Sequence, residues 1–252
     1  MSMVADLLRA IDPAQIAADA DLIADDWQLD FIRSDAAQMA ALIPRQHGKT
    51  EAAVLKALSI AMSELDSLIV IASPAQRLSD EFIRRARKAY ERIDGAPPLV
   101  GDAARRLEFQ SGSRILAVPG DNDGDTIRGL ANVRLAIIDE CSRCSDDLIA
   151  AIRPFLATNK RGQLIYLSTP AGKRGVFYET WVSSDSDWKR IHVKLGSCSR
   201  ITSEFLDRER KNLGPTKFAQ EYECEFLDND DAAFSTTLID AIVDPNLKAI
   251  RW

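Results

Sequence analysis

The sequence has few of the residues that cross-link proteins through disulfides or metal ions. It contains four cysteines and two histidines in 252 residues, too few for the disulfide framework of a secreted domain. Cys141 and Cys144 have the spacing of half a zinc site, but Cys198 and Cys224 are single and distant, and His47 lies within another motif. Because a structural zinc site needs four ligands, we expect free thiols in a reducing compartment.

Long apolar segments are also missing. No apolar run approaches the roughly 20 residues that a helix needs to cross a bilayer. The first residues, Met1–Ile11, carry Asp6 and Arg9 and lack a basic start, so they do not have the pattern of a secretory signal. These absences predict a cytoplasmic protein with no membrane partner.

An excess of positive charge is absent as well. The 32 Lys and Arg residues face 38 Asp and Glu, which gives a formal net charge of −6 and a pI of about 5.1. This balance argues against a protein that coats nucleic acid non-specifically, although one basic face, or several copies around a shared channel, could still bind DNA. The basic stretch Arg84–Arg92 is one candidate, but such a helix face is usually only solvated.

Short apolar runs alternate with longer helical stretches, a rhythm typical of a parallel sheet wrapped by helices. The predicted strands are Ala41–Ile43, Leu68–Ala72, Ile115–Val118, Leu135–Ile138, Leu164–Ser168 and Ile191–Leu195, and Arg106–Phe109 is expected to form a hairpin with Arg114–Val118. The predicted helices are Lys49–Leu65, Leu78–Ile93, one capped by Ser145, Ser203–Leu213 and Pro215–Glu225. The hydrophobic fraction of 46% and the length fit one large α/β domain or two small ones.

Residue types typical of a phosphate-binding loop follow the first predicted strand, in Ile43-Pro44-Arg45-Gln46-His47-Gly48-Lys49-Thr50. A nucleoside triphosphate needs backbone N–H groups at a helix N-terminus, a cation on its phosphates and a hydroxyl on Mg²⁺. Gly48 permits close backbone approach, Lys49 supplies the charge and Thr50 supplies the hydroxyl. The full phosphate-loop pattern asks for Gly where Ile43 stands, so a plain helix N-terminus with a surface lysine is the alternative.

Two carboxylates follow the most apolar predicted strand, in Leu135-Ala136-Ile137-Ile138-Asp139-Glu140. Ligands of open α/β sheets gather at the carboxyl ends of the strands, so Asp139 and Lys49 are expected to meet there. Asp139 is predicted to hold Mg²⁺, and Glu140 to orient and deprotonate the attacking water. Since strands commonly end in acidic turns, the pair is informative only together with Lys49.

Five motifs follow one another along the chain: Trp27-Gln28, Arg45–Thr50, Thr126–Gly129, Leu167–Pro170 and Glu221–Phe226. As an ordered set they resemble the motifs of large terminase subunits of tailed phages. Arg45-Gln46-His47-Gly48-Lys49-Thr50 resembles their deviant phosphate loop, Trp27-Gln28 their adenine motif, Thr126-Ile127-Arg128-Gly129 their Arg-Gly element, Leu167-Ser168-Thr169-Pro170 their coupling motif, and Glu221–Phe226 the segment that closes their ATPase domain. Only the phosphate loop is specific by itself, whereas the ordered set is a strong signal. The resemblance implies a P-loop NTPase with a mostly parallel central sheet flanked by helices and a small C-terminal helical lid subdomain.

The resemblance also implies a function. The chain would use ATP and Mg²⁺ to drive double-stranded viral DNA into a procapsid, as a homo-oligomeric ring with the portal protein and the small terminase subunit as partners, in the cytoplasm of the bacterial host. The implied divisions are an N-terminal helical extension (1–24), the ATPase core (25–195), a lid-like subdomain (196–233) and a tail or linker (234–252).

The resemblance further implies roles for single residues. Trp27 and Gln28, with the phosphate loop Arg45–Thr50, would bind ATP, and Arg45 would reach the γ-phosphate of its own site. Arg128 would be an arginine finger for a neighbouring subunit. Ser168 and Thr169 would couple the γ-phosphate to the lid.

Each of these roles has a plain structural alternative. Arg128 is also explained as a surface arginine beside a flexible glycine. Trp27 and Gln28 are also explained as residues that seat a helix N-terminus, and Ser168 and Thr169 as a turn that ends a strand. These alternatives stay open at the level of sequence.

Other functions also stay open. Large terminase subunits usually continue into an RNase H-like nuclease, but the acidic residues Asp228–Asp231 are too close to the ATPase motifs to build one, so nuclease activity is not expected here. A helicase-like nucleic-acid-dependent ATPase and a non-catalytic nucleotide-binding assembly module are the alternatives to the packaging motor.

Overall fold

The computed structural model describes the backbone of residues 3–118, 130–198 and 200–228. One mixed sheet organises this part of the chain, with eight strands in the order β3-β4-β5-β2-β6-β7-β1-β8. The strands are β1 (Gln38–Leu42), β2 (Leu68–Ala72), β3 (Leu99–Ala103), β4 (Arg106–Phe109), β5 (Arg114–Val118), β6 (Val133–Asp139), β7 (Gln163–Ser168) and β8 (Trp188–His192). The strands from β5 to β8 in this order pair in parallel, whereas β3, β4 and β5 pair antiparallel.

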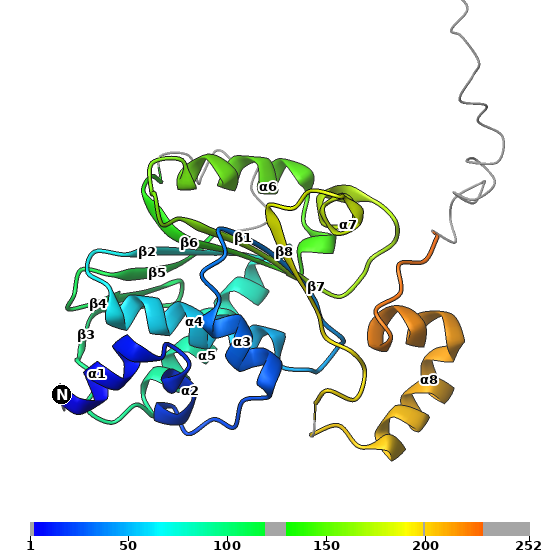
Figure 1. Cartoon of the computed structure of the whole chain (residues 1–252), viewed down its shortest axis with the longest axis horizontal. Helices are drawn as coiled ribbons and strands as arrows, with labels where there is room; N and C mark the ends of the chain where they lie inside the picture. Colours follow the sequence, from blue (N-terminus) through cyan, green and yellow to red (C-terminus); the bar gives the residue numbers. More distant parts are fainter. Residues whose placement is uncertain (1–2, 119–129, 199, 229–252) are drawn as a thin grey trace, which may run out of the picture.

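Helices cover both faces of the sheet (Figure 1). The first five lie on one face and α6 and α7 on the other, while α8 stands beside the sheet. The helices are α1 (Met3–Ile11), α2 (Gln15–Asp19), α3 (Asp26–Arg33), α4 (Lys49–Ser63), α5 (Gln76–Tyr90), α6 (Asp146–Ile152), α7 (Gly175–Val182) and α8 (Ser203–Tyr222), with the short 3₁₀ helices η2 (Cys141–Arg143) and η3 (Arg153–Leu156). This arrangement confirms the predicted α/β fold.

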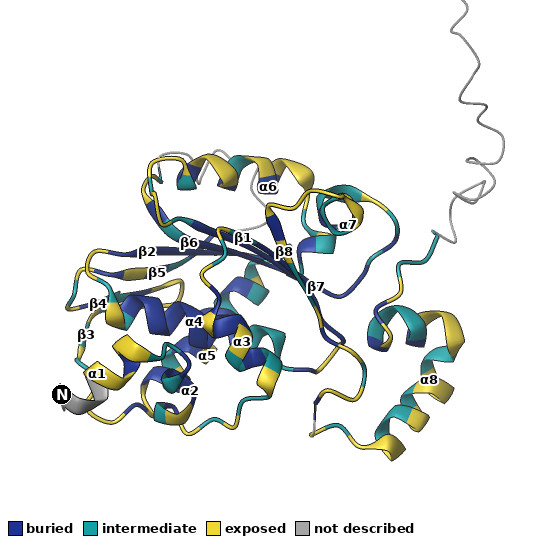
Figure 2. Ribbon diagram, viewed as in Figure 1, coloured by how far each residue is buried: buried dark blue, intermediate teal, exposed yellow. Residues whose placement is uncertain are grey.

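The central strands are buried on both faces, as their continuous apolar sequences predict (Figure 2). Two hydrophobic clusters result, one between the sheet and α2 to α5, the other between the sheet and α6 and α7. Helix α4 is buried nearly all round, because α1, α2 and α3 cover its outer side. The helix ends at Ser63 rather than at the predicted Leu65, which is 79% exposed.

Lys56, in the middle of α4, caps the end of the neighbouring helix α3. Its Nζ donates to the carbonyl oxygens of Phe31, Ile32 and Ser34 at 3.4, 3.1 and 2.6 Å. These carbonyls belong to the last turn of α3 and its C-cap, where a cation satisfies orphan acceptors and complements the helix dipole. Burial lowers the pKa of Lys56 to about 8.

The predicted strands differ from the structure mainly in their limits, and helices α3 and α7 were not predicted. Strand β1 begins three residues before the predicted Ala41, and β8 begins at Trp188 rather than Ile191. Strand β3 was not predicted, because most of its residues are exposed and it has no apolar alternation. The hairpin of β4 and β5 and the Ser145 cap, whose Oγ accepts from Leu148 N at 3.3 Å, confirm the prediction.

Helix α8 has a sharp break that the sequence also predicts. Gly214 adopts φ 73° and ψ 168°, and Pro215 begins the second half, as expected for two helices in series. The break turns the second half of α8 back towards the phosphate loop, where Arg45 N donates to Glu221 O at 2.8 Å. The predicted limits of the lid-like subdomain and of the N-terminal extension stay predictions, and the tail 234–252 lies outside the described residues.

No helix in the described part of the chain is long and apolar enough to span a membrane.

Candidate functional site

The carboxyl ends of three neighbouring strands lie level with one another. Leu167 of β7 is in register with Ala41 of β1 on one side and with Asp139 of β6 on the other. The loop after β1 and the acidic end of β6 therefore meet at one edge of the sheet, although β7 separates the two strands. This is the position at which open α/β sheets bind ligands.

The loop after β1 approaches helix α4 through a glycine that no other residue could replace without strain. Gly48 has φ +79°, and a Cβ there would lie 2.8 Å from Gln28 Nε2 and 3.3 Å from Arg200 Nη2. Gln46 also adopts a left-handed conformation, with φ 62°. The loop thus leads directly into the N-terminus of a buried helix, whose first amides and dipole favour an anion.

Lys49 and Thr50, the first two residues of α4, reach the two carboxylates at the end of β6. Lys49 Nζ lies 2.6 Å from Glu140 Oε1, and Thr50 Oγ1 donates to Asp139 Oδ2 at 2.9 Å. The four side chains that sequence analysis assigned to phosphate, metal and water therefore converge.

Asp139 is enclosed at the end of its strand, with 6% of its surface exposed. Burial raises the pKa of its carboxyl above the usual value, and the charge of Lys49 offsets part of this rise. A cation beside this carboxylate would stabilise its charged form. The donor set of one carboxylate and one hydroxyl fits Mg²⁺, which prefers oxygen ligands and retains several waters.

Glu140 follows Asp139 in a left-handed backbone conformation, with φ 55° and ψ 39°. Non-glycine residues rarely adopt this conformation, and they keep it only where surrounding contacts impose it. Here the Glu140 carboxylate has two cationic partners, Lys49 and Arg143, the latter with Nη1 at 3.1 Å from Oε2. Arg143 is not among the predicted site residues, because the signal in its segment was the spacing of Cys141 and Cys144.

The residues of the predicted coupling motif pack directly against the loop after β6. Ser168 Oγ accepts from Ser142 N at 3.1 Å, and Thr169 O accepts from Ser142 Oγ at 2.9 Å. Thr169 Oγ1 also accepts from Arg143 at 3.0 Å. Both predicted residues are buried, so the end of β7 and the loop that carries Glu140 form one hydrogen-bonded unit.

Gln28 lies beside the phosphate loop, whereas Trp27 faces elsewhere. Gln28 Nε2 donates to Gly48 O at 3.0 Å, and its Oε1 accepts from Asp25 N at 2.9 Å. Gln28 therefore caps the N-terminus of α3, which is the structural role given above as the alternative to ATP binding. It also contacts the phosphate loop. Trp27 lines a separate cavity of about 480 Å³ with Lys189 and Ile191.

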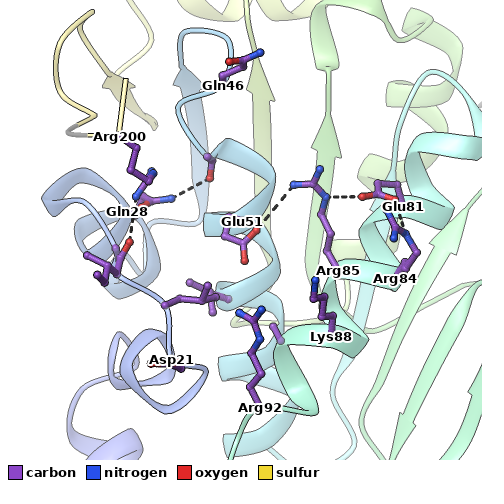
Figure 3. Close-up of a pocket in the computed structure, with 16 residues that line it drawn as sticks. Asp21, Gln28, Gln46, Glu51, Glu81, Arg84, Arg85, Lys88, Arg92 and Arg200 are labelled. Atoms are coloured by element: carbon purple, nitrogen blue, oxygen red, sulfur yellow. Dashed lines mark hydrogen bonds and ion pairs between the residues drawn. The ribbon is translucent and has the colours of Figure 1, made fainter. Parts of the chain in front are cut away.

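A cavity of about 640 Å³ extends from the phosphate loop between α4, α5 and the loop that joins α2 to α3 (Figure 3). Gln28 and Gln46 line its upper end, and α5 forms the opposite wall. Gly48, whose carbonyl accepts from Gln28, also lines the cavity. Its basic residues are Arg84, Arg85 and Lys88 of α5, Arg92 just after this helix, and Arg200, and its acidic residues are Asp21, Glu51 and Glu81. Arg84 and Arg85 both pair with Glu81, so part of this positive charge is neutralised within the wall.

The remaining predicted residues of the loop differ in their surroundings. His47 is buried, with its Nδ1 2.9 Å from Arg45 O, and its Nε2 has no hydrogen-bond partner among the described residues. Burial lowers the pKa of His47, which favours the neutral ring. The Arg45 side chain is 59% exposed and its Nη1 lies 4.0 Å from Glu221 Oε2. Arg128 lies outside the described residues.

The cysteines do not form a metal site in the described part of the chain. All four are free thiols, and Cys141, Cys198 and Cys224 are buried. Burial raises the pKa of Cys144 and of Cys224 to about 12, so both stay protonated at neutral pH. The described residues contain no group of three His, Cys, Asp or Glu placed to hold a metal ion.

A phosphate loop between a parallel strand and a helix, with an acidic strand end facing its lysine, places the fold among the P-loop NTPases. A family model, "Terminase large subunit, T4likevirus-type, N-terminal", matches residues 40–241. The chain therefore belongs to the terminase large subunit family.

Solved structures show the same fold. The ATPase domain of the Thermus phage P74-26 large terminase superposes with a TM-score of 0.72 at 22% identity, over 84% of this chain and 97% of that one. The large terminase of the thermophilic bacteriophage D6E gives a TM-score of 0.71 at 12% identity, over 81% of this chain and 54% of its own length. The HK97 bacteriophage large terminase gives 0.67 at 17% identity, over 81% and 51%.

The chain thus spans about half the length of the D6E and HK97 large terminases. The D6E protein has been solved with ADP and with ATP-gamma-S. The comparison with curated proteins gave no match.

Proposed function

We propose that this chain is a Mg²⁺-dependent ATPase and the motor that moves double-stranded viral DNA into a procapsid. The observation that carries the proposal is the convergence of Lys49 with Glu140, at 2.6 Å, and of Thr50 with Asp139, at 2.9 Å. Membership of the terminase large subunit family and the nucleotide complexes of the D6E protein support it.

Each residue at this edge of the sheet has a role that its position suits. Lys49 exchanges its bond to Glu140 for the phosphates of ATP, and the amides at the start of α4 hold the same anion. Glu140, released from Lys49, orients the attacking water and accepts its proton. Thr50 and Asp139 would hold Mg²⁺, which supplies positive charge to the phosphates when bound.

The base and ribose of ATP would occupy the upper end of the 640 Å³ cavity. Gln28 is placed there, and its amide has a fixed orientation because it bonds both Asp25 N and Gly48 O. The buried Nε2 of His47, without a partner among the described residues, is a polar atom available within the loop. Arg45 would neutralise charge on the γ-phosphate of its own site, and Arg128 would do so at the site of a neighbouring subunit. Trp27 has no such position, since it lines another cavity.

The proposal includes partners that the family suggests. The ring on the portal protein, the small terminase subunit and the DNA would all be engaged in the cytoplasm of the bacterial host. The Ser168 and Thr169 unit would transmit the state of the γ-phosphate, because it is hydrogen-bonded to the loop that carries Glu140.

Single-turnover hydrolysis with the chain in excess over radiolabelled ATP tests the enzymatic proposal. We expect Lys49→Ala to abolish nucleotide binding, and Glu140→Gln to retain binding while the rate falls by about 10²- to 10⁴-fold. Glu179→Gln, on the exposed side of α7, is the matched control and should hydrolyse at the wild-type rate. A Glu140→Gln protein with the wild-type rate would rule out this base, and binding by Lys49→Ala as tight as that of the wild type would rule out the site.

A further inference from the structure

One arginine outside the predicted site joins three of its parts. Arg143 Nη1 lies 3.1 Å from Glu140 Oε2 and donates to Thr169 Oγ1 at 3.0 Å, while Nη2 donates to Glu221 Oε1 at 3.1 Å. These partners come from the loop after β6, the end of β7 and the second half of α8. One guanidinium therefore contacts the proposed base, the coupling motif and the lid helix together.

The backbone holds Arg143 in place for these contacts. It is the last residue of η2, whose turn is closed by Arg143 N donating to Glu140 O at 2.9 Å. The preceding Ser142 is bonded to both Ser168 and Thr169. The guanidinium is therefore fixed relative to β6 and β7, whereas α8 reaches it across a break at Gly214. The planar guanidinium, with five donors, suits several acceptors at once, which a lysine does not.

The charges around these residues show what ATP binding would change. Three cations, Lys49, Arg45 and Arg143, face two carboxylates, Glu140 and Glu221. Under the proposed function, Lys49 and Arg45 turn to the phosphates. Arg143, which contacts both carboxylates, is then the cation left beside them.

We propose that Arg143 is a positioning residue that couples the catalytic carboxylate Glu140 to the lid helix α8 through Glu221. This inference rests on the proposed function. When ATP draws Lys49 from Glu140, Arg143 keeps the carboxylate oriented, and the same guanidinium holds α8 against Thr169. A displacement of α8 that pulls Glu221 away changes the contacts of Arg143 and so the orientation of Glu140.

The test uses Arg143→Gln, Arg143→Lys, Glu221→Gln and the double variant Arg143→Gln/Glu221→Gln in the whole chain. Arg161→Gln is the matched control, because Arg161 pairs with Glu64, away from this edge of the sheet. Binding of a fluorescent ATP analogue, single-turnover hydrolysis and hydrogen exchange of the α8 amides are measured on each protein, with thermal unfolding as the check of folding.

We expect Arg143→Gln to lower the hydrolysis rate by about 10- to 100-fold, the effect of a misplaced catalytic group, with the affinity for the analogue within about threefold of the wild type. Arg143→Lys should restore only part of the rate. The α8 amides of residues 216–222 should exchange faster in Arg143→Gln and in Glu221→Gln. The double variant should be no slower in hydrolysis than Arg143→Gln alone, because both changes break one linkage.

Hydrolysis by Arg143→Gln at the rate of Arg161→Gln would overturn the inference and leave the proposed function intact. Hydrolysis by Arg143→Lys at the wild-type rate would also overturn it. So would a double variant whose hydrolysis rate falls by the product of the factors found for the two single variants. If instead the wild-type chain binds the analogue no better than Lys49→Ala, the proposed function itself fails, which the binding measurement distinguishes from a failure at Arg143 alone.

Discussion

The buried Lys56 makes the free energy of unfolding of this chain depend on pH, and the substitution Lys56→Met isolates this dependence. Lys56 is 3% exposed, and burial lowers its pKa from 10.5 to about 8. The unfolded chain therefore binds more protons than the folded chain between these two values. Since stability rises with pH wherever the unfolded state binds more protons, the Lys56 contribution rises from about pH 8 to about pH 10.5 and is constant below and above this window.

The size of this effect follows from the pKa difference. One pKa unit corresponds to about 1.4 kcal/mol, so the free energy of unfolding should gain about 1.4 kcal/mol from Lys56 between about pH 7 and about pH 9. Buried thiols oppose this trend, because burial raises the pKa of Cys144 and Cys224 to about 12 and the unfolded chain ionises them first. The quantity to compare is therefore the difference in free energy of unfolding between wild type and Lys56→Met at each pH. The thiols contribute equally to both proteins and drop out of this difference.

Urea unfolding of both proteins at about pH 7, 8 and 9 gives this difference. We expect Lys56→Met to be destabilised by about 1–3 kcal/mol at pH 7, because three carbonyls at the end of α3 lose their donor. The destabilisation should grow by about 1.4 kcal/mol at pH 9. A difference that stays constant across this range would refute the reasoning, since it would mean that Lys56 titrates alike in the folded and unfolded chain.

Three further predictions concern the phosphate loop. Gly48→Ala should lose about 1–2 kcal/mol of stability, because the residue has φ +79° and its new Cβ would displace Gln28; urea unfolding measures this, and an unchanged midpoint would contradict it. Glu140→Gln should bind ATP about two- to fivefold more tightly, because Lys49 loses a competing partner at 2.6 Å; a fluorescent-nucleotide titration decides, and weaker binding would contradict it. Thr50→Val should weaken nucleotide binding by about tenfold with Mg²⁺ present and leave binding in EDTA unchanged; calorimetry in both buffers checks this, and equal losses would contradict it.

Local sequence was sufficient for the features that depend on neighbours along the chain. The strands β2, β6 and β7 could be recognised because each contains a continuous apolar run that is buried on both faces. The helix after the phosphate loop and the break at Gly214 follow from residue types with strong backbone preferences. Strand β3 could not be recognised, since pairing with β4 and the ion pair of Asp102 with Arg87 hold an exposed segment in place.

The sequence by itself determined the loop at Gly48, Lys49 and Thr50 and the acidic end of β6, because a glycine, a lysine and two carboxylates carry their chemistry wherever they stand. Only the tertiary structure decided which residues join them. Arg143 bonds Thr169, 26 residues away, and Glu221, 78 residues away, because β7 lies between β6 and β1 and the broken α8 returns to the same edge. Such contacts depend on strand order and on the path of the lid, which no local preference of the chain encodes.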